Sequence, residues 1–468
     1  MQKTIAFLLV TGCLILGTGC ELFNTEDEDI PTIDYSAIQD IRFSEHVLPL
    51  VQKKFALLLG QETGLRLDSW ESLIAGSDFG EVLIPFDAEN SLLLELATRL
   101  DPPHPSQATA DSLTRAEIDF MARWINEGAR NDAGQVPYAD ADQRLYVCNQ
   151  DEGSISVIDT EANVVIRTVK LADFGFTGTP KPHHIDVEPD GLFWYVSLIG
   201  ANTVLKFNRD DELVGQAGPF ETPGMVAVHP TEDILYAGRS LSAVDPPRSI
   251  GVIRRSDMNL ELVEVFFQKP HALRVSPDGA YLYTASLVTN QMASVNTATR
   301  DVSLAGFTGI PQAYLHLAIS PDSRTMYMTG QVAGQLSIVD LSDPTDLALV
   351  ATLDVNAGPW HPTLSPDGSR LYFGNKQANT VTVVDTQARA VVDVIGGNGL
   401  AEPHGSALSP DGRFLYISNN NQQGVYTPRY NLGDNDRDGT VVVIDTVTNE
   451  IVKVLEIGAF PTGMGARQ

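Results

Sequence analysis

Residues 409–416 read SPDGRFLY, and this stretch decides the fold. Proline sets the φ angle of a turn corner and glycine accepts a positive φ, so Ser409-Pro410-Asp411-Gly412 predicts a tight turn. Leu415-Tyr416 then predicts a strand that leaves this turn. The same turn and strand recur upstream, in full at 276–283, 320–327 and 365–372 and in weaker form at 188–195 and 229–236.

A second signature follows each tyrosine, namely a strand of β-branched residues that often ends in aspartate. It occurs in seven copies with a period of roughly 45 residues, which is the range of four-stranded propeller blades. The sequence therefore predicts a mainly β fold, a seven-bladed β-propeller over residues 140–468. The copies are 156–159, 204–207, 251–254, 293–296, 337–340, 382–385 and 442–445.

The two ends of the predicted propeller complement each other. The first blade starts directly at Arg144-Leu145-Tyr146, without an innermost strand, whereas residues 460–464 look like an innermost strand without a blade. We expect these two segments to pair in one blade. The ring would then close and leave no open sheet edge between the first and last blades.

These repeats resemble the bacterial propeller proteins named after a Tyr-Val-Thr-Asn repeat. They also resemble the related seven-bladed propellers of lactonases, nitrite reductases and nitrous oxide reductases. The resemblance implies the architecture. It does not imply one activity, because this superfamily hosts enzymes, metal carriers and plain binding surfaces.

A small all-α unit is expected before the propeller, over residues 36–135. Residues 114–117 form a capping box, apolar residues recur at helical spacing up to Ile125, and Gly128 ends that helix. Residues 91–100 predict a second helix, which Pro102-Pro103 ends.

The order of these pieces resembles a cytochrome c-like domain of multidomain bacterial proteins. That family carries a Cys-x-x-Cys-His motif and a methionine ligand, but here residues 55–59 read FALLL and Asp101 stands at the methionine position. Without thiols and axial ligands we expect no haem, with Leu57 to Leu59 filling its volume and the remaining His46 and His104 as surface or capping residues. The matching stretches are 64–69, 84–87, 91–93, 117–118 and 124–129.

The N-terminus has the pattern of an export signal. Lys3 precedes an apolar stretch too short to span a bilayer, and small residues lead to Cys20. This resembles a bacterial lipoprotein signal, which implies that Cys20 is acylated and anchors the mature chain to the membrane of the cell envelope, on its periplasmic face or at the cell surface. Modification at Cys13 and an ordinary cleaved signal are the alternatives. The predicted division is a signal peptide at 1–20, an acidic tether at 21–35, the haem-less helical unit at 36–135 and the propeller at 140–468.

Composition limits the partners. The net charge is −29, and phosphate surfaces repel such a protein, so nucleic acid is not expected as a partner. The acidity suits solubility, with attraction of a basic partner as the alternative. Cys148 lies in an apolar strand and predicts a small buried side chain rather than a nucleophile.

Six histidines stand at one repeat position, shortly before the turn, where the innermost strands of a propeller begin around its channel. Imidazole suits copper, zinc, iron and nickel, and the resemblance to nitrous oxide reductase implies a copper site there. The histidines fall in two phases one residue apart, and neighbouring strand residues face opposite ways, so we expect three to converge rather than six. The second phase would pack blades unless bulges turn it inward, and bonding between blades is the alternative role for all six. The leading phase is His183, His271 and His404, and the second is His184, His316 and His361.

Asp434, Asp436 and Asp438 alternate before Gly439, within an insertion of the seventh blade. Alternating carboxylates before a glycine resemble a calcium-binding loop. A bare acidic turn is the alternative, so calcium is a candidate cofactor.

Three functions remain open. The first hypothesis is a cell-envelope scaffold whose propeller binds envelope proteins or a small ligand. The second is a histidine-coordinated metalloprotein, either a copper carrier or an oxidoreductase. The third is a lactonase-like hydrolase, which ranks last because its metal-binding carboxylates cannot be assigned from the sequence.

Overall fold

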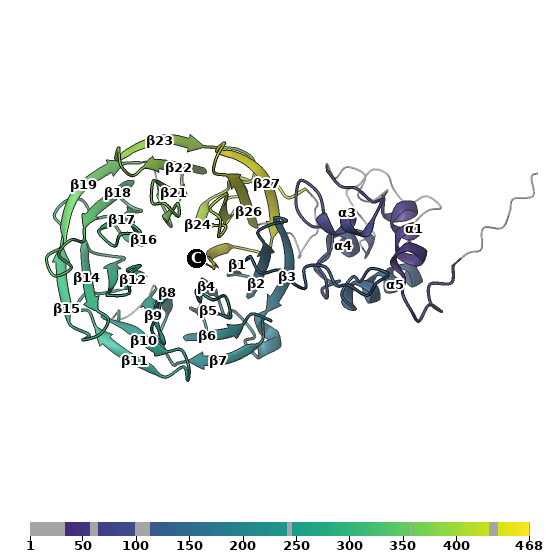
Figure 1. Ribbon diagram of the computed structural model, residues 1–468, viewed down its shortest axis with the longest axis horizontal. Coiled ribbons are helices and arrows are strands. Elements are labelled where there is room, and N and C mark those ends of the chain that lie inside the picture. Colours follow the sequence, from purple (N-terminus) through teal and green to yellow (C-terminus); the bar gives the residue numbers. More distant parts are fainter. Residues whose placement is uncertain are drawn as a thin grey trace, which may run out of the picture.

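The computed structural model describes residues 33–56, 64–98, 113–240, 246–355, 358–429 and 439–467. It shows a ring of seven four-stranded sheets beside a small group of helices (Figure 1). The predicted seven-bladed β-propeller is thereby confirmed. Cys20 and the three aspartates at 434, 436 and 438 lie outside the described residues, so the lipid anchor and the calcium loop stay predictions.

The strands of each blade follow one another from the channel to the rim (Figure 1). Blade 1 contains β28 (Pro461–Ala466), β1 (Arg144–Asn149), β2 (Ser154–Asp159) and β3 (Val164–Lys170); blade 2 contains β4 (Pro182–Val187), β5 (Phe193–Leu198), β6 (Thr203–Asn208) and β7 (Leu213–Ala217). Blade 3 contains β8 (Pro223–Val228), β9 (Ile234–Arg239), β10 (Ser249–Arg254) and β11 (Leu260–Glu264); blade 4 contains β12 (Pro270–Val275), β13 (Tyr281–Ser286), β14 (Gln291–Asn296) and β15 (Val302–Gly306). Blade 5 contains β16 (Tyr314–Ile319), β17 (Thr325–Gly330), β18 (Gln335–Asp340) and β19 (Ala348–Asp354); blade 6 contains β20 (Thr363–Leu364), β21 (Arg370–Asn375), β22 (Thr380–Asp385) and β23 (Ala390–Ile395). Blade 7 contains β24 (Pro403–Leu408), β25 (Phe414–Asn419), β26 (Gly439–Asp445) and β27 (Glu450–Ile457).

The ring closes as expected, within blade 1. Strand β28 pairs antiparallel with β1, with Leu145 opposite Ala466 and Val147 opposite Met464. Blade 7 is also tied to blade 1, because the buried Tyr416 hydroxyl donates to the Thr160 carbonyl at 3.3 Å and to Asn163. The first and last segments of the propeller therefore share the sheet of blade 1, and a buried polar contact ties blade 7 to it.

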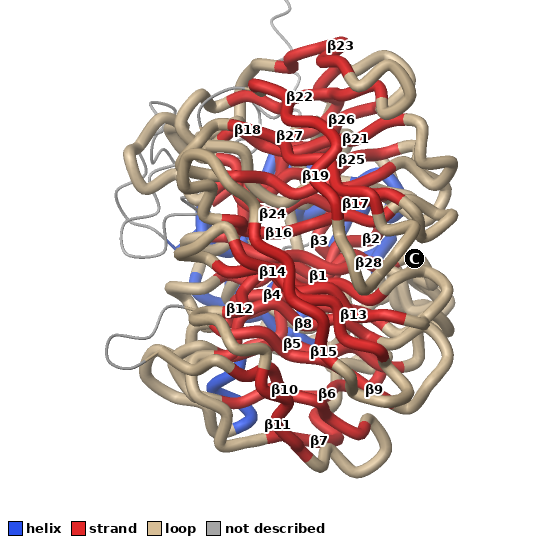
Figure 2. Tube along the Cα trace, turned by 90° about the vertical axis from the view of Figure 1, so that its left-hand side faces the viewer, coloured by secondary structure: helices blue, strands red, loops and turns tan. Residues whose placement is uncertain are grey.

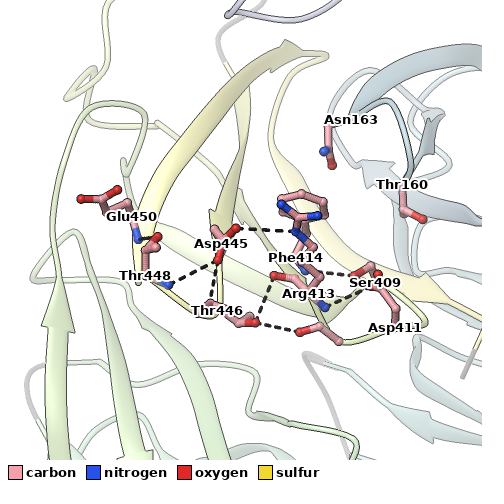
Figure 3. A network of polar contacts seen from close by, with 12 residues as sticks. Thr160, Asn163, Ser409, Asp411, Arg413, Phe414, Asp445, Thr446, Thr448 and Glu450 are labelled. Carbon is pink, nitrogen blue, oxygen red and sulfur yellow. Dashed lines mark hydrogen bonds and ion pairs between the residues drawn. The ribbon is translucent and has the colours of Figure 1, made fainter.

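The recurrent turn residues form a small hydrogen-bonded unit, shown for blade 7 in Figure 3. The Ser409 hydroxyl donates to Asp411 at 2.5 Å and accepts from the Phe414 amide at 2.9 Å. Asp445, which ends β26, accepts from the Val447 amide at 2.8 Å and so caps the next turn. The serine and both aspartates of the repeat thus stabilise turns.

The core lies between neighbouring blades. Side chains from the facing sheets of blades 1 and 2 form one buried cluster around Trp194, whose ring stacks on Phe207 at 4.2 Å between centroids. Cys148 belongs to this cluster and is fully buried, as expected of a small apolar side chain. Burial raises the pKa of its thiol well above the ordinary value. In side view the strands lie between two loop-covered faces (Figure 2).

The helical segment precedes the ring and packs against its edge (Figure 1). The capping box is confirmed, since the Thr114 hydroxyl accepts from the Glu117 amide and the Glu117 carboxylate accepts from the Thr114 amide. The buried Glu81 carboxylate accepts from the Val165 amide of β3 at 3.0 Å, which joins the helices to blade 1. The helical elements are η1 (Phe43–Val47), α1 (Leu48–Leu50), η2 (Val51–Phe55), α3 (Trp70–Ala75), α4 (Leu92–Thr98) and α5 (Arg115–Asn126), and η3 (Leu171–Phe174) follows β3 within the propeller.

The resemblance of this unit to a cytochrome c domain, and the expectation that it binds no haem, stay predictions. Among the residues described, no helix is long and apolar enough to cross a membrane.

Candidate functional site

All six channel histidines come together, which corrects the expectation that only three would converge. The expectation assumed strict alternation along each strand, and register shifts near the start of four innermost strands break that alternation. These shifts lie between Pro182 and His184 in β4, between Pro270 and Ala272 in β12, between Tyr314 and Leu317 in β16, and between Pro403 and Ser406 in β24.

The second phase, expected to pack blades, forms the tightest group. The rings of His184, His316 and His361 make a triangle with centroid distances of 5.3, 5.9 and 4.9 Å. We call these three residues the inner triad. The first phase lies beside it: His183 is 5.6 Å from His271 and 6.1 Å from His404, and the His404 ring lies 5.0 Å from that of His361.

Backbone amides fix the proton positions in the inner triad. The amide of Val226 donates to Nδ1 of His184 at 3.3 Å, and the amide of Leu317 donates to Nδ1 of His316 at 2.8 Å. A neutral imidazole whose Nδ1 accepts carries its proton on Nε2. Burial lowers the pKa of all three imidazoles well below the ordinary value, which keeps them neutral. His184 and His316 are therefore N–H donors.

His361 completes the inner triad with a different group. Its side chain is 3% exposed, and its Nε2 is buried without a hydrogen-bond partner among the described residues. Buried polar atoms are nearly always partnered, so an atom of this kind next to a cavity suggests that a ligand or solvent molecule meets it. A free nitrogen thus stands beside two N–H donors.

The inner triad opens into a cavity of about 550 Å³ along the channel. The prolines of six turns line its other end, so the cavity extends to the face that carries the Ser-Pro-Asp-Gly turns. Arg274 also lines the cavity, and its half-buried side chain has no hydrogen bond or ion pair to the described residues. Its charge helps to lower the pKa values of all three triad imidazoles.

Asp186 is the acidic residue buried in the cavity wall. One carboxylate oxygen accepts from the Val228 amide at 2.8 Å and the other from its neighbour Val187 at 3.1 Å. Burial raises the pKa of this carboxyl group, although the Arg274 guanidinium opposes the effect. Because backbone amides engage both oxygens, the Asp186 carboxylate is held in the wall of the cavity.

Sequence reasoning missed Arg274 and Asp186. Both stand two residues before the first residue of the turn, which is Glu188 in blade 2 and Ser276 in blade 4. Blades 3, 5 and 7 carry alanine at this position. A charged residue at a repeat position that otherwise holds a small residue was the signal available.

The first-phase histidines have the opposite bonding pattern. Nδ1 of His271 donates to the Leu315 carbonyl at 2.9 Å, and Nδ1 of His183 lies 3.3 Å from Oε1 of Gln150. Their Nε2 atoms face each other at 3.4 Å. We call His183 and His271 the facing pair. In the described part of the chain, no group of three or more histidine, cysteine, aspartate or glutamate side chains is already arranged to hold a metal ion.

Known proteins share this architecture. A family model described as a lactonase seven-bladed β-propeller matches residues 212–435. The 6-phosphogluconolactonase of Cronobacter sakazakii is 24% identical over 297 residues, which are 58% of this chain and 86% of that protein.

Two solved structures extend the comparison of folds. The periplasmic gluconolactonase of Pseudomonas aeruginosa superposes with a TM-score of 0.55 at 20% identity, covering 69% of this chain and 98% of its own. The hydrazine synthase of Kuenenia stuttgartiensis superposes with a TM-score of 0.50 at 19% identity, covering 61% of this chain and 90% of that chain. At these identities the superpositions show the fold alone. The comparisons favour the lactonase hypothesis, which the sequence analysis ranked last, over the scaffold. Residues 212–435 of the propeller are therefore similar to the lactonase family of seven-bladed β-propellers.

Proposed function

We propose that this protein hydrolyses a lactone in the channel cavity, with the inner triad and Arg274 as its working groups. The observation that carries the proposal is the donor set: two imidazole N–H groups and one guanidinium border a cavity beside an unpartnered imidazole nitrogen. The family match and the relative named 6-phosphogluconolactonase support the choice of a lactone.

The chemistry follows from these roles. Water attacks the lactone carbonyl carbon while Nε2 of His361 takes its proton, and general-base catalysis of this kind contributes about 10²–10⁴-fold. Negative charge develops on the carbonyl oxygen, where the Nε2–H groups of His184 and His316 and the guanidinium of Arg274 stabilise it. The ring C–O bond then breaks, and the departing alkoxide receives the proton from His361. The product is the open hydroxy acid.

The experiment measures acid release from δ-gluconolactone and 6-phosphogluconolactone above the spontaneous rate, using the purified chain. We expect turnover by the native protein and its loss in the His361→Gln variant. The matched control is His229→Gln, since His229 is also a buried propeller histidine but bonds the Gly279 carbonyl at 2.9 Å outside the cavity. Absence of turnover on a wider panel of lactones, or equal turnover in the His361→Gln variant, would overturn the proposal and favour the scaffold hypothesis.

We further infer that the protein works in the cell envelope. The lipoprotein-like pattern ending at Cys20 supports this location, as does the periplasmic name of one similar structure. Replacing Cys20 with serine should move the protein from the membrane fraction to the soluble fraction. Unchanged membrane association of that variant would contradict the anchor.

A further inference from the structure

The main chain at His361 differs from the main chain at the other two members of the inner triad. His184 lies within the six-residue strand β4 and His316 within the six-residue strand β16, whereas the innermost strand of blade 6, β20, has only two residues. Pro362 directly follows His361 and has no amide hydrogen for a strand ladder. His361 therefore precedes the innermost strand of its blade instead of lying within it.

The ring of His361 also lacks the hydrogen bonds that fix its neighbours. Backbone amides donate to Nδ1 of His184 and of His316, but neither ring nitrogen of His361 has a hydrogen bond to the described residues. The rings of His316 and His404 pack against it, with centroid distances of 4.9 and 5.0 Å. Because no bond to the ring itself is present there, its placement depends on the main chain that carries it.

Blade 7 holds that main chain on both sides. The Ser406 hydroxyl of β24 donates to the His361 carbonyl at 2.6 Å, and the His361 amide donates to the His404 carbonyl at 3.4 Å. The Ser406 bond is the shorter of the two, and its burial shields it from competition by water. The neighbouring blade therefore fixes both peptide groups of His361, with Ser406 as the stronger contact.

The direction of the Ser406 hydroxyl is fixed as well. Its oxygen lies 2.8 Å from the hydroxyl oxygen of Thr363, and the His361 carbonyl can only accept. The single hydroxyl proton of Ser406 is therefore used on the His361 carbonyl, and Thr363 donates in the contact between the two hydroxyl groups. Thr363 also lies 3.0 Å from the Ser406 carbonyl, so this side chain of β20 holds Ser406 at two atoms.

From these contacts we infer that Ser406 is a positioning residue for His361. The inference rests on the proposed function, in which His361 is the general base, and it concerns the same cavity, since Ser406 and Thr363 also line it. Attack on the lactone needs reacting atoms held about 3–3.5 Å apart, and a displacement of about 1 Å can cost about 10²-fold in rate. Without the Ser406 bond the imidazole keeps its chemistry and loses its placement.

The test compares two serines of blade 7 in the full-length purified chain. Ser418 is the matched control, because its buried hydroxyl also donates at 2.6 Å across a blade boundary, to the Thr462 carbonyl of β28. We expect kcat for δ-gluconolactone to fall about 10–10²-fold in Ser406→Ala with KM within about twofold, and to stay within about threefold in Ser418→Ala. The Ser406→Thr variant keeps a hydroxyl and should restore most of the lost kcat.

A second measurement does not need turnover. With ¹³C-labelled histidine, the ring resonance of His361 is assigned by its absence in the His361→Gln variant. This resonance should shift or broaden in Ser406→Ala and stay in place in Ser418→Ala. Melting temperatures show that the variants are folded, and if Ser406→Ala does not fold, Ser406→Cys with its weakly donating thiol replaces it.

Two results would overturn the positioning role: an equal loss of kcat in the two alanine variants, or an unchanged His361 resonance in Ser406→Ala. Absence of lactone turnover in the native chain would overturn the proposed hydrolysis instead. The resonance would still decide whether Ser406 holds His361, so the two failures are distinguishable.

Discussion

The inner triad and the facing pair are the two histidine groups of the channel, and their imidazoles have opposite hydrogen-bonding patterns. In the inner triad, backbone amides donate to Nδ1 of His184 and His316, and the outward nitrogens become donors. In the facing pair, the Leu315 carbonyl accepts from Nδ1 of His271, which makes Nε2 of His271 an acceptor, and Nδ1 of His183 lies 3.3 Å from Oε1 of Gln150. The hydrogen bond at Nδ1 of an imidazole therefore decides whether its Nε2 is a hydrogen-bond donor or an acceptor.

The largest effect is expected at the free nitrogen of the inner triad. Replacing His361 with glutamine should lower kcat/KM for lactone hydrolysis by about 10²–10⁴-fold, because a general base is removed. Steady-state kinetics measures this fall in kcat/KM, with the His229→Gln variant as the control. Binding of Zn²⁺ by the His361→Gln variant should be unchanged. If the variant lost Zn²⁺ binding but kept full hydrolysis, His361 would be a metal ligand and not the general base.

A smaller but still large effect is expected at the N–H donors. The His316→Phe variant keeps a ring in place but cannot donate to the developing oxyanion, so kcat should fall about 10²–10³-fold with little change in KM. The measurement is the separation of kcat from KM, with a melting temperature to show that the blade is intact. A rise in KM at constant kcat would mean that His316 only binds the ground state.

A third prediction tests the metalloprotein hypothesis at Gln150, which contacts Nδ1 of His183 in the facing pair. Replacing Gln150 with leucine removes the acceptor at Nδ1 of His183, and loss of such a partner typically costs about 10–100-fold in metal affinity. Calorimetric titration with Zn²⁺ measures the metal affinity of this variant, and unchanged lactone turnover shows that the channel is intact. Tighter binding in this variant would show that the amide nitrogen of Gln150, rather than its acceptor oxygen, faces His183.

The smallest effect is expected from metal removal. If the two histidine groups are independent, chelation should change lactone turnover by no more than about twofold, since the inner triad stabilises charge with protons alone rather than with a Lewis acid. Activity before and after dialysis against EDTA, with metal content followed by elemental analysis, tests this. A large loss that Zn²⁺ restores would mean that one ion serves both groups.

The repeat predicted the ring because each blade carries its own turn chemistry. Ser409, Asp411 and Asp445 show why: they bond within a few residues of themselves, so local sequence is sufficient. The pairing of β28 with β1 was predictable because the first repeat lacks an innermost strand and the last segment of the chain supplies one. These parts of the fold depend on short-range interactions or on the number of copies.

The site was predictable only in part. The six histidines were identified, but alternation along a strand predicted that neighbouring residues face apart, and the register shifts that break this alternation depend on pairing with the next strand. The two proton patterns depend on contacts far apart in sequence, such as Val226 with His184 and Leu315 with His271. Arg274 stands out in the sequence only when the equivalent positions of the blades are compared.

Ring closure through β28 makes the completed channel depend on the last strand of the propeller. The strand that completes blade 1 follows every other blade along the chain, and Thr462 within it bonds the carbonyls of Pro182 and His183 at 3.3 Å. A growing or partly exported chain can carry all six histidines before this strand arrives. The contact that ties blade 1 to the backbone of His183 can therefore form only after residues 461–466 have left the ribosome.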